Sequence, residues 1–356
     1  MFCMPLAGAQ RRIRAPLFFA LPFAYHPRRT IGTQGRPGGM GGEPGRVICI
    51  GGATVDRKYR VGAPIQLGTS NPATSERSFG GVARNVAENI ARLGTSACLV
   101  SILGDDENGH AIHSHLAGLA IDTRHVVVSR DHATAEYVAV LEPDGDLALG
   151  LADMAIFDAL SPALLRDIWP DLSGAWIFAD CNLPSATLHE LVRLARRDAA
   201  MLAIDAVSTR KATRLPRDLS GIGLLFLNLD EARALLDEPS ASPEDLAAAL
   251  LDRGADRAVL TLGEGGLIAM DRSGVTRVEA MPVQVVDATG AGDALIAGTL
   301  LAMLNGRSLA QAARMGTVAA ASTLGCRDSV CPDLTLAGLE AAAAPRISPR
   351  PGEEPS

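Results

Sequence analysis

DATGAGDALIAGTLLAML, at residues 287–304, is the stretch that decides the fold we expect. The apolar segment VQVVD (283–287) indicates a strand, the next residues form a turn of small side chains, and an apolar helix is expected to begin around Asp293. The first backbone N–H groups of a helix have no partner inside it, and small residues leave them open to a ligand. Together with the helix dipole they make an anion site. This order of elements therefore predicts a phosphate-binding turn.

A carboxylate, Asp293, stands in the same turn. As a charge near a helix start it would contribute only about 0.3–1 kcal/mol, and Ser or Thr would serve there as well. Beside a bound phosphate it could instead accept a proton from an attacking hydroxyl group. We therefore interpret Asp293 as a candidate general base.

Outward from this stretch, short apolar runs alternate with segments of helical periodicity. Such runs, separated by amphipathic helices, indicate a parallel sheet that is covered on both faces. We therefore predict an α/β fold. The expected strands are 47–50, 97–103, 175–180, 201–205, 223–228 and 258–262, and the expected helices are 82–93, 109–119, 184–196 and 243–251.

Two regions, 59–79 and 124–149, interrupt this alternation. The second holds AEYVAVL (135–141) and LALGLA (147–152) on either side of the turn PDGD (143–146). Extended segments around such a turn predict a β-hairpin. Because hairpin strands do not easily join a parallel sheet, we expect the strands of both regions to form a small β lid, approximately within 56–79 and 124–150.

The composition excludes several classes of protein. Of the 356 residues, 47% are hydrophobic and 21% are charged, so most of the chain is expected to fold. The net charge of -7 offers no attraction for nucleic acid or anionic lipid. The longest apolar run, 15–25, contains two prolines and is far shorter than the ~20 residues of a spanning helix. We therefore expect neither nucleic acid nor a membrane as a partner.

The lysines and cysteines exclude one kind of nucleotide site and indicate the redox environment of the protein. The only two lysines, Lys58 and Lys211, do not follow a glycine, which excludes a P-loop. The six cysteines contain no C-x-x-C pair, and most stand singly in apolar runs. We expect them to be reduced and buried, in a cytoplasmic protein.

The two ends of the chain differ from the middle. Residues 1–42 carry six arginines, no acidic residue and several Gly/Pro breaks. We expect 1–45 to be an extension outside the fold: a transit peptide, a secretory signal, or a disordered segment that precedes a true start at Met40. The folded domain is expected at 46–335, and the Pro-rich segment 336–356 is expected to be a tail.

Two stretches resemble the signatures of the ribokinase-like, or PfkB, carbohydrate kinases. GGVARNVAENIARLG (80–94), with Asn85 and its flanking glycines, is similar to the first signature, and 287–293 is similar to the second. Ala288 departs from the second signature, where we expect Thr, Ser, Pro or Val. The resemblance covers about 47–332. It implies a ribokinase-like three-layer α/β/α fold with a mainly parallel sheet and a small β lid.

The resemblance also implies a reaction, phosphoryl transfer from ATP to an alcohol. Asp293 would take the proton of the attacking hydroxyl, and the amides of Gly290, Ala291 and Gly292 would stabilise charge on the transferred group. Mg²⁺ would be placed through water by Glu231 of an N-x-x-E motif, since Mg²⁺ prefers oxygen ligands and retains water. A monovalent cation such as K⁺ and a homodimer are compatible with the family.

Binding residues follow from the same resemblance. Asp56 would accept hydrogen bonds from two neighbouring sugar hydroxyls. Without the resemblance, Asp56 could be an ordinary turn residue, N-x-x-E an ordinary helix start, and TLGEGG (261–266) a hairpin turn. The expected acceptor-binding residues are Asp56, Gly80, Gly81 and Asn85, and the expected nucleotide-binding residues are Asn228, Thr261, Gly263, Gly266 and Thr289.

Within the family, the Ser70-Asn71-Pro72 turn and LADM (151–154) resemble the kinases of pseudouridine more than ribokinases, fructokinases or adenosine kinases. This similarity implies phosphorylation of the 5′-hydroxyl of pseudouridine. Tyr137 and Lys211 are further candidates for substrate contact. Tyr137 could equally be an ordinary strand aromatic, and Lys211 could be a chance survivor in an arginine-rich chain.

Alternatives stay open at this point. The acceptor could be another ribonucleoside or a free sugar such as ribose. A dinucleotide-binding oxidoreductase would use GGATVD (51–56) as its phosphate turn, but the third glycine is missing. A non-catalytic ligand-binding protein would be expected to have lost Asp293. The three histidines within 110–115 are more typical of a solvated helix than of a metal site.

Overall fold

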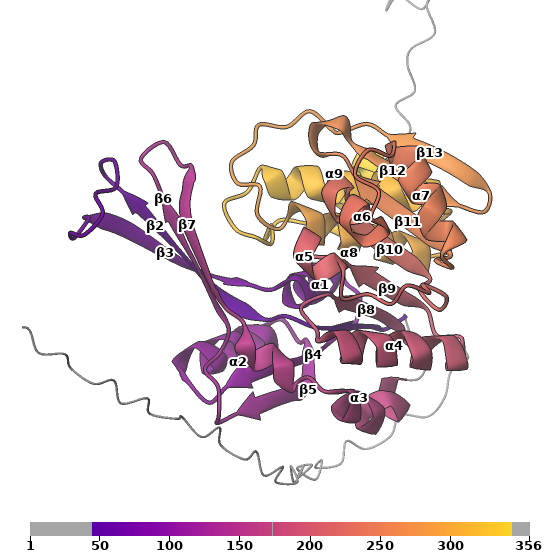
Figure 1. Cartoon of the computed structure of the whole chain (residues 1–356), viewed down its shortest axis with the longest axis horizontal. Coiled ribbons are helices and arrows are strands. Elements are labelled where there is room, and N and C mark those ends of the chain that lie inside the picture. Colours follow the sequence, from indigo (N-terminus) through magenta and orange to yellow (C-terminus); the bar gives the residue numbers. More distant parts are fainter. Residues whose placement is uncertain (1–44, 173, 344–356) are drawn as a thin grey trace, which may run out of the picture. The chain divides into compact units, whose positions relative to one another are not determined.

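A computed structural model describes residues 45–172 and 174–343 of the chain (Figure 1). Residues 1–44 of the expected N-terminal extension lie outside the described residues, and so does the expected C-terminal tail after Ala343. In the described part of the chain, no helix has both the length and the apolar character that crossing a membrane requires.

Nine strands form the central sheet, in the order β13-β12-β11-β10-β9-β8-β1-β4-β5. All neighbouring pairs are parallel except β11–β12 and β12–β13, which are antiparallel. The predicted mainly parallel sheet is thereby confirmed. The strands are β1 (Val47–Ile50), β4 (Ala97–Gly104), β5 (Asp122–Ser129), β8 (Trp176–Asp180), β9 (Leu202–Asp205), β10 (Leu224–Asn228), β11 (Arg257–Thr261), β12 (Leu267–Asp271) and β13 (Gly274–Val278).

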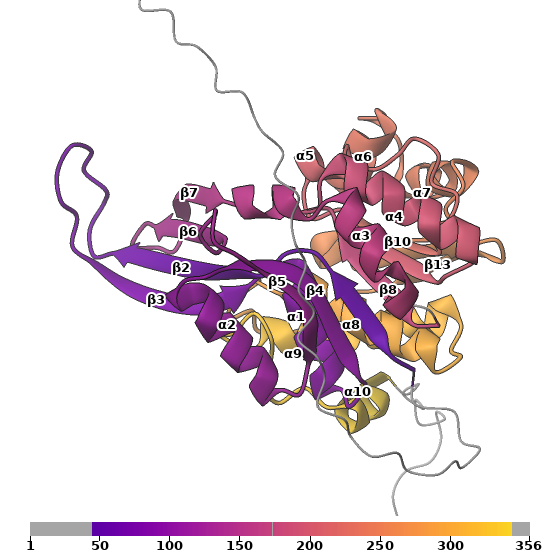
Figure 2. The same cartoon turned by 90° about the horizontal axis from the view of Figure 1, so that it is seen from below.

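Helices cover both faces of this sheet because its strands are apolar on both sides. In β1, Ile48 and Ile50 pack into one hydrophobic core, whereas Val47 and Cys49 pack into the other. The three-layer α/β/α arrangement is thus confirmed (Figure 2). One core lies under α3 (Pro162–Ile168), α4 (Ser185–Asp198), α6 (Leu229–Leu236) and α7 (Pro243–Asp252), and the other under α1 (Val82–Arg92), α2 (Glu107–Gly118), α8 (Ala291–Leu304) and α9 (Leu309–Leu324).

A second sheet of four strands projects from the central sheet (Figure 1). Its order is β3-β2-β6-β7, and we call it the lid. The predicted hairpin is confirmed, because β6 and β7 pair antiparallel around 142–146. The lid strands are β2 (Thr54–Val61), β3 (Ala73–Gly80), β6 (Glu136–Leu141) and β7 (Leu147–Asp153).

The structure corrects two expected strands. Residues 124–129 were expected in the lid, but they belong to β5, which pairs parallel with β4 at the edge of the central sheet. An edge strand keeps polar residues such as Arg124 in solvent, which is why its pattern resembled that of a lid strand. VQVVD (283–287) is not a strand. The segment pairs with no strand and is tied down by the Val286 amide, which donates to the Leu324 carbonyl at 2.8 Å.

Two further expectations about the C-terminal region were wrong. Ordered structure continues past residue 335 into α10 (Leu336–Ala343), because Leu339 buries its side chain in the core beneath that helix. Cys326 and Cys331 are joined by a disulfide rather than being separate thiols. The other cysteines of the described residues, Cys49, Cys98 and Cys181, are free and buried, as expected.

Candidate active site

The glycine turn before α8 forms one wall of the site. Gly290 caps the helix with φ of 82°, and a Cβ there would lie 1.8 Å from the Ser329 carbonyl oxygen, so only glycine fits. Asp287 organises the turn, because its carboxylate accepts from the Thr289 amide at 2.8 Å and from the Thr289 hydroxyl at 2.7 Å. The helix begins at Ala291, two residues before the expected start. Asp293 therefore lies in its first turn.

Asp293 is nearly enclosed, with 9% of its surface exposed. Burial raises the pKa of Asp293 to about 7, and the carboxylates of Asp180 and Asp56 act in the same direction. Asn85 and the Arg84 guanidinium oppose the pKa rise, since the Asn85 amide donates to Asp293 Oδ2 at 2.6 Å. A carboxylate with a pKa near neutrality can both accept and release a proton under ordinary conditions.

The start of α1 brings Asn85 to this position. Gly81 precedes the helix with φ of 92°, and a Cβ there would lie 2.4 Å from the Gly52 carbonyl oxygen. The close approach packs the turn after β1 against the turn before α1. Asn85 of the first signature therefore meets Asp293 of the second signature, to which its side chain donates a hydrogen bond.

Asp180, at the end of β8, holds the same two turns together and was not predicted. Its buried carboxylate accepts from the amides of Gly52 at 2.9 Å, Ala83 at 2.8 Å and Asn182 at 2.9 Å. Burial nevertheless raises the pKa of Asp180 above its ordinary value. The signal available in the sequence was an acidic residue at the end of an apolar strand, the position where parallel sheets bind ligands.

The lid supplies Asp56 and Tyr137. These residues are register partners on β2 and β6, so their side chains share one face of the lid. Asp56 Oδ1 accepts from the Thr54 hydroxyl at 2.9 Å, and burial raises the pKa of Asp56. A Cβ on Gly80 would lie 2.1 Å from Asp56 Oδ2. Gly80 therefore makes room for the Asp56 carboxylate.

Lys58, whose sequence neighbours only excluded a P-loop, joins the lid to the glycine turn. It lies two residues after Asp56 on β2, on the same face. Its Nζ forms an ion pair with Asp287 and lies 3.4 Å from the Thr289 hydroxyl. A pair separated by 229 residues in the chain leaves no signal in the sequence pattern.

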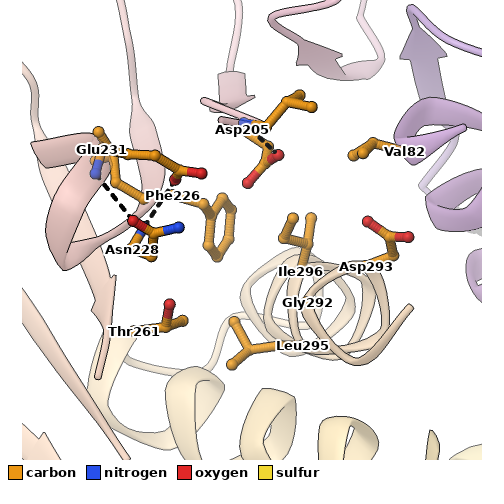
Figure 3. Close-up of a pocket in the computed structure, with 12 residues that line it drawn as sticks. Val82, Asp205, Phe226, Asn228, Glu231, Thr261, Gly292, Asp293, Leu295 and Ile296 are labelled. Atoms are coloured by element: carbon orange, nitrogen blue, oxygen red, sulfur yellow. Dashed lines mark hydrogen bonds between the residues drawn. The ribbon is translucent and has the colours of Figure 1, made fainter. Parts of the chain in front are cut away.

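Asp293 also lines a cavity, which Figure 3 shows with the residues around it. Four more of the predicted residues line this cavity: Asn228, Glu231, Thr261 and Gly292. Asn228 and Glu231 form a capping box at the start of α6, where the Glu231 amide donates to Asn228 Oδ1 at 2.9 Å and the Asn228 amide donates to Glu231 Oε2 at 2.8 Å. The motif is thus a helix start and a cavity wall at once.

Asp205, at the end of β9, lines the same cavity and was not predicted. Burial raises the pKa of Asp205 well above its ordinary value, and the neighbouring Glu231 and Asp293 carboxylates raise it further. In the described ranges no three His, Cys, Asp or Glu side chains are close enough to hold one metal ion directly. The oxygen-rich acidic wall suits a hard cation held through water.

The remaining predicted residues lie away from the cavity lining. Gly263 and Gly266, expected in a nucleotide-binding loop, lie in the turn between the antiparallel strands β11 and β12, so the hairpin turn given as the alternative is present. Gly266 has φ of 79° and approaches Val278 closely, which accounts for it structurally. Lys211, in the short helix α5 (Thr209–Ala212), donates to Asn182 Oδ1 at 2.5 Å. Burial lowers the pKa of Lys211, and Asp180 opposes this shift.

Known proteins are similar to this chain over most of its length. The model of the pfkB family of carbohydrate kinases matches residues 45–333. Pseudouridine kinase of Escherichia coli (strain K12) is 29% identical over 300 residues, which are 82% of this chain and 95% of that protein. Guanosine-inosine kinase of Exiguobacterium acetylicum is 29% identical over 285 residues, 78% of this chain and 94% of that protein.

A solved structure is similar in the same way. The carbohydrate kinase from Agrobacterium tumefaciens matches with a TM-score of 0.75 and 31% identity. The match spans 84% of this chain and 97% of that structure's chain.

Proposed function

The chain belongs to the pfkB family of carbohydrate kinases, and we propose that it transfers the terminal phosphoryl group of ATP to the 5′-hydroxyl of pseudouridine. Membership establishes the coarser statement, an ATP-dependent phosphotransferase with an alcohol acceptor, which is a sugar or a nucleoside. The acceptor and the roles of individual residues are the proposal.

The observation that carries the mechanism is the position of Asp293 beside the glycine turn of α8. The acceptor hydroxyl gives its proton to the Asp293 carboxylate while its oxygen attacks the terminal phosphorus, and ADP leaves with the electrons of the broken P–O bond. Backbone amides of Gly290, Ala291 and Gly292 stabilise the charge on the transferred group. The 2.6 Å hydrogen bond from Asn85 keeps the carboxylate oriented.

The cavity between α6 and α8 is proposed to hold the phosphates. Asn228, Thr261 and Thr289 bind the nucleotide, and Gly263 and Gly266 shape the loop beside it. Glu231 and Asp205 line this cavity and would hold a hydrated Mg²⁺ through its water molecules, because Mg²⁺ prefers oxygen ligands and retains water. Bound Mg²⁺ supplies neutralisation of phosphate charge. Activation by K⁺ stays a prediction, tested by comparing rates in K⁺ and Na⁺ buffers.

The lid face that carries Asp56 and Tyr137 is proposed to bind the acceptor. A carboxylate accepts hydrogen bonds from two adjacent hydroxyls, which suits the ribose of a nucleoside. Tyr137 offers an aromatic surface beside it, and such a surface stacks on a planar base. Lys211 is proposed to contact the base or a phosphate, although its ammonium is occupied by Asn182 in this structure. The formation of a homodimer stays a prediction.

Two of the relatives support a nucleoside acceptor over a free sugar, since their names record pseudouridine and guanosine or inosine as substrates. Because both are 29% identical to this chain, identity alone does not rank them. Pseudouridine is favoured by the Ser70-Asn71-Pro72 turn and the segment 151–154. Another ribonucleoside is the second candidate.

A panel of acceptors with ATP tests the proposal. Pseudouridine, uridine, guanosine, inosine and ribose are each assayed for kcat/KM, and the product is analysed by phosphorus NMR for the position of the phosphate. Uridine is the matched control, because it carries the same ribose and base atoms joined through nitrogen instead of carbon. We expect pseudouridine to exceed uridine by at least about tenfold, equivalent to one hydrogen bond of about 1.4 kcal/mol.

Each other outcome points elsewhere. Higher kcat/KM for guanosine or inosine would move the chain to the second candidate, and higher kcat/KM for free ribose would overturn the nucleoside assignment. Equal rates for pseudouridine and uridine would mean that the site reads the ribose only.

A further inference from the structure

Arg84 lies one residue before Asn85 in α1 and is almost completely enclosed, with 2% of its surface exposed. A guanidinium is costly to bury unless its donors and its charge are satisfied. Arg84 Nε donates to the Gly80 carbonyl at 3.0 Å, and Arg84 Nη2 donates to the Phe79 carbonyl at 2.9 Å. Its charge is paired with Glu88 one helical turn later. Such complete satisfaction fixes the guanidinium in one position.

The remaining contact of Arg84 is with Asn85. Arg84 Nη2 donates to Asn85 Oδ1, while Asn85 Nδ2 donates to Asp293 Oδ2 at 2.6 Å. A side-chain amide has an acceptor end and a donor end, so the partners around it decide which way the amide is turned. The guanidinium occupies the acceptor end, because it has no acceptor of its own. The donor end of Asn85 is thereby directed at Asp293.

Glu88 holds the other side of the guanidinium. It is 3% exposed and accepts from Arg92 Nη2 at 2.7 Å, and His115 Nε2 lies 2.8 Å from its second oxygen. Arg92 and His115 are more exposed than Glu88, so the chain of contacts runs from the surface inwards. The network thus connects the outer side of α1 to the carboxylate at the start of α8.

We propose that Arg84, clamped by Glu88, is a positioning residue for the phosphoryl transfer: it orients the Asn85 amide, which in turn holds Asp293 in place to accept the proton. The inference rests on the proposed role of Asp293 as the base. Arg84 itself would touch neither substrate nor nucleotide. Its contribution is expected in kcat, because the geometry of the base matters in the transition state.

The charge of Arg84 has a second consequence. The charged groups around Asp293 are Arg84 on α1, Asp56 on β2, Asp180 at the end of β8, Asp205 at the end of β9 and Glu231 on α6. Arg84 is the cation of this set and lowers the pKa of Asp293, whereas Asp180 and Asp56 raise it. Removal of the guanidinium should therefore move the rise of kcat with pH to higher pH.

The test compares Arg84→Met, Arg84→Lys and a surface control, Arg166→Met, in the full-length protein. Arg84→Met is expected to lower kcat at least tenfold and to raise the pH midpoint of kcat by half a unit or more. Arg84→Lys keeps the charge but loses the forked arrangement of donors. The pH midpoint of kcat should therefore stay at the value of the unmodified protein, while kcat is restored only in part. Arg166→Met, whose guanidinium pairs with Glu190 at the surface, should match the unmodified protein.

A double variant separates positioning from any other role. In the Asp293→Asn background, Arg84→Met should change kcat less than twofold, because residues that act through one another are not additive. A tenfold loss in that background would overturn the inference, as would a folded Arg84→Met protein with unchanged kcat and midpoint. If Arg84→Met does not fold, Arg84→Lys decides, and unmodified kcat in that variant overturns the inference. Near-normal turnover of Asp293→Asn would refute the proposed base itself.

Discussion

The two sides of the candidate site are built in opposite ways. The lid is a single sheet, and its site residues Asp56, Lys58 and Tyr137 stay half-buried on β2 and β6. The facing side, at the starts of α1 and α8, lies between the central sheet and its helices and buries Asn85 and Asp293. The carboxylate of Asp56 is therefore partly in contact with water, whereas that of Asp293 is surrounded by protein.

With the proposed roles, this difference would separate acceptor binding from catalysis. A half-buried carboxylate such as Asp56 can exchange water for substrate hydroxyls at little cost. A buried carboxylate such as Asp293 is destabilised as an anion, so its pKa approaches neutrality and its position is held by Asn85. Changes on the buried side should therefore lower turnover, whereas changes on the lid should weaken acceptor binding.

The largest effect is expected for Asp293→Asn. Loss of the general base should lower kcat by about 100-fold or more while leaving ATP binding nearly intact. Steady-state kinetics and a titration with ATP check both parts. A fall in ATP affinity as large as the fall in kcat would contradict the proposal that changes on the buried side lower turnover rather than binding.

The same variant should gain stability at high pH. The pKa of Asp293 is raised to about 7 from its ordinary value of 3.8, so the unfolded chain ionises first and native stability falls as pH rises from about 4 to 7. Asn carries no charge and escapes this loss, which amounts to at most about 4 kcal/mol. Melting temperatures of both proteins at pH 5 and pH 8 measure it: the advantage of the variant should appear at pH 8.

A comparable but separable effect is expected for Asp56→Ala on the lid. Two hydroxyl hydrogen bonds to a charged group are lost, each at about 1.5–3 kcal/mol, so KM for the acceptor should rise by about a hundredfold or more. KM for ATP should change little. Leu149→Ala, an exposed β7 position on the opposite face of the lid, is the matched control. Equal increases for acceptor and ATP would put Asp56 outside the acceptor site.

The pH profile of the unmodified enzyme should show a smaller effect. Because the base must be ionised, kcat should rise about tenfold from pH 6 to pH 8, with a midpoint near the value of about 7 for Asp293. Measurements at saturating acceptor and ATP isolate this step. A flat profile across this range would contradict proton transfer to Asp293 as the step that limits turnover.

The smallest effect is expected for Lys58→Met, which removes the ion pair between the lid and Asp287. The pair is about one quarter exposed on each side, so its contribution is about 1 kcal/mol or less. KM for the acceptor should rise about threefold. Lys58→Arg retains the charge and should stay closer to the unmodified protein. A change in kcat alone would mean that Lys58 belongs functionally to the buried side.

Regular elements could be predicted where the pattern is local. The apolar runs at 47–50 and 97–103 are strands, and the hairpin around 142–146 follows from its turn residues. VQVVD failed because β-branched residues favour an extended chain, but a strand also needs a neighbour with free hydrogen-bonding groups. β5 was assigned to the wrong sheet for the same reason, because the sequence of a strand does not reveal which strand it pairs with.

The candidate site divides in the same way. The two signatures identified Asp293 and Asn85 from short stretches of sequence, because a glycine turn and its helix are local structures. Asp180, Asp205, Arg84 and Lys58 acquire their positions only in the folded chain: Asp180 reaches Gly52 across 128 residues, and Lys58 reaches Asp287 across 229. A parallel sheet brings the carboxyl ends of distant strands to one edge. Burial and neighbouring charges at that edge then set the pKa of each carboxylate, and so decide which of them can accept a proton near neutral pH.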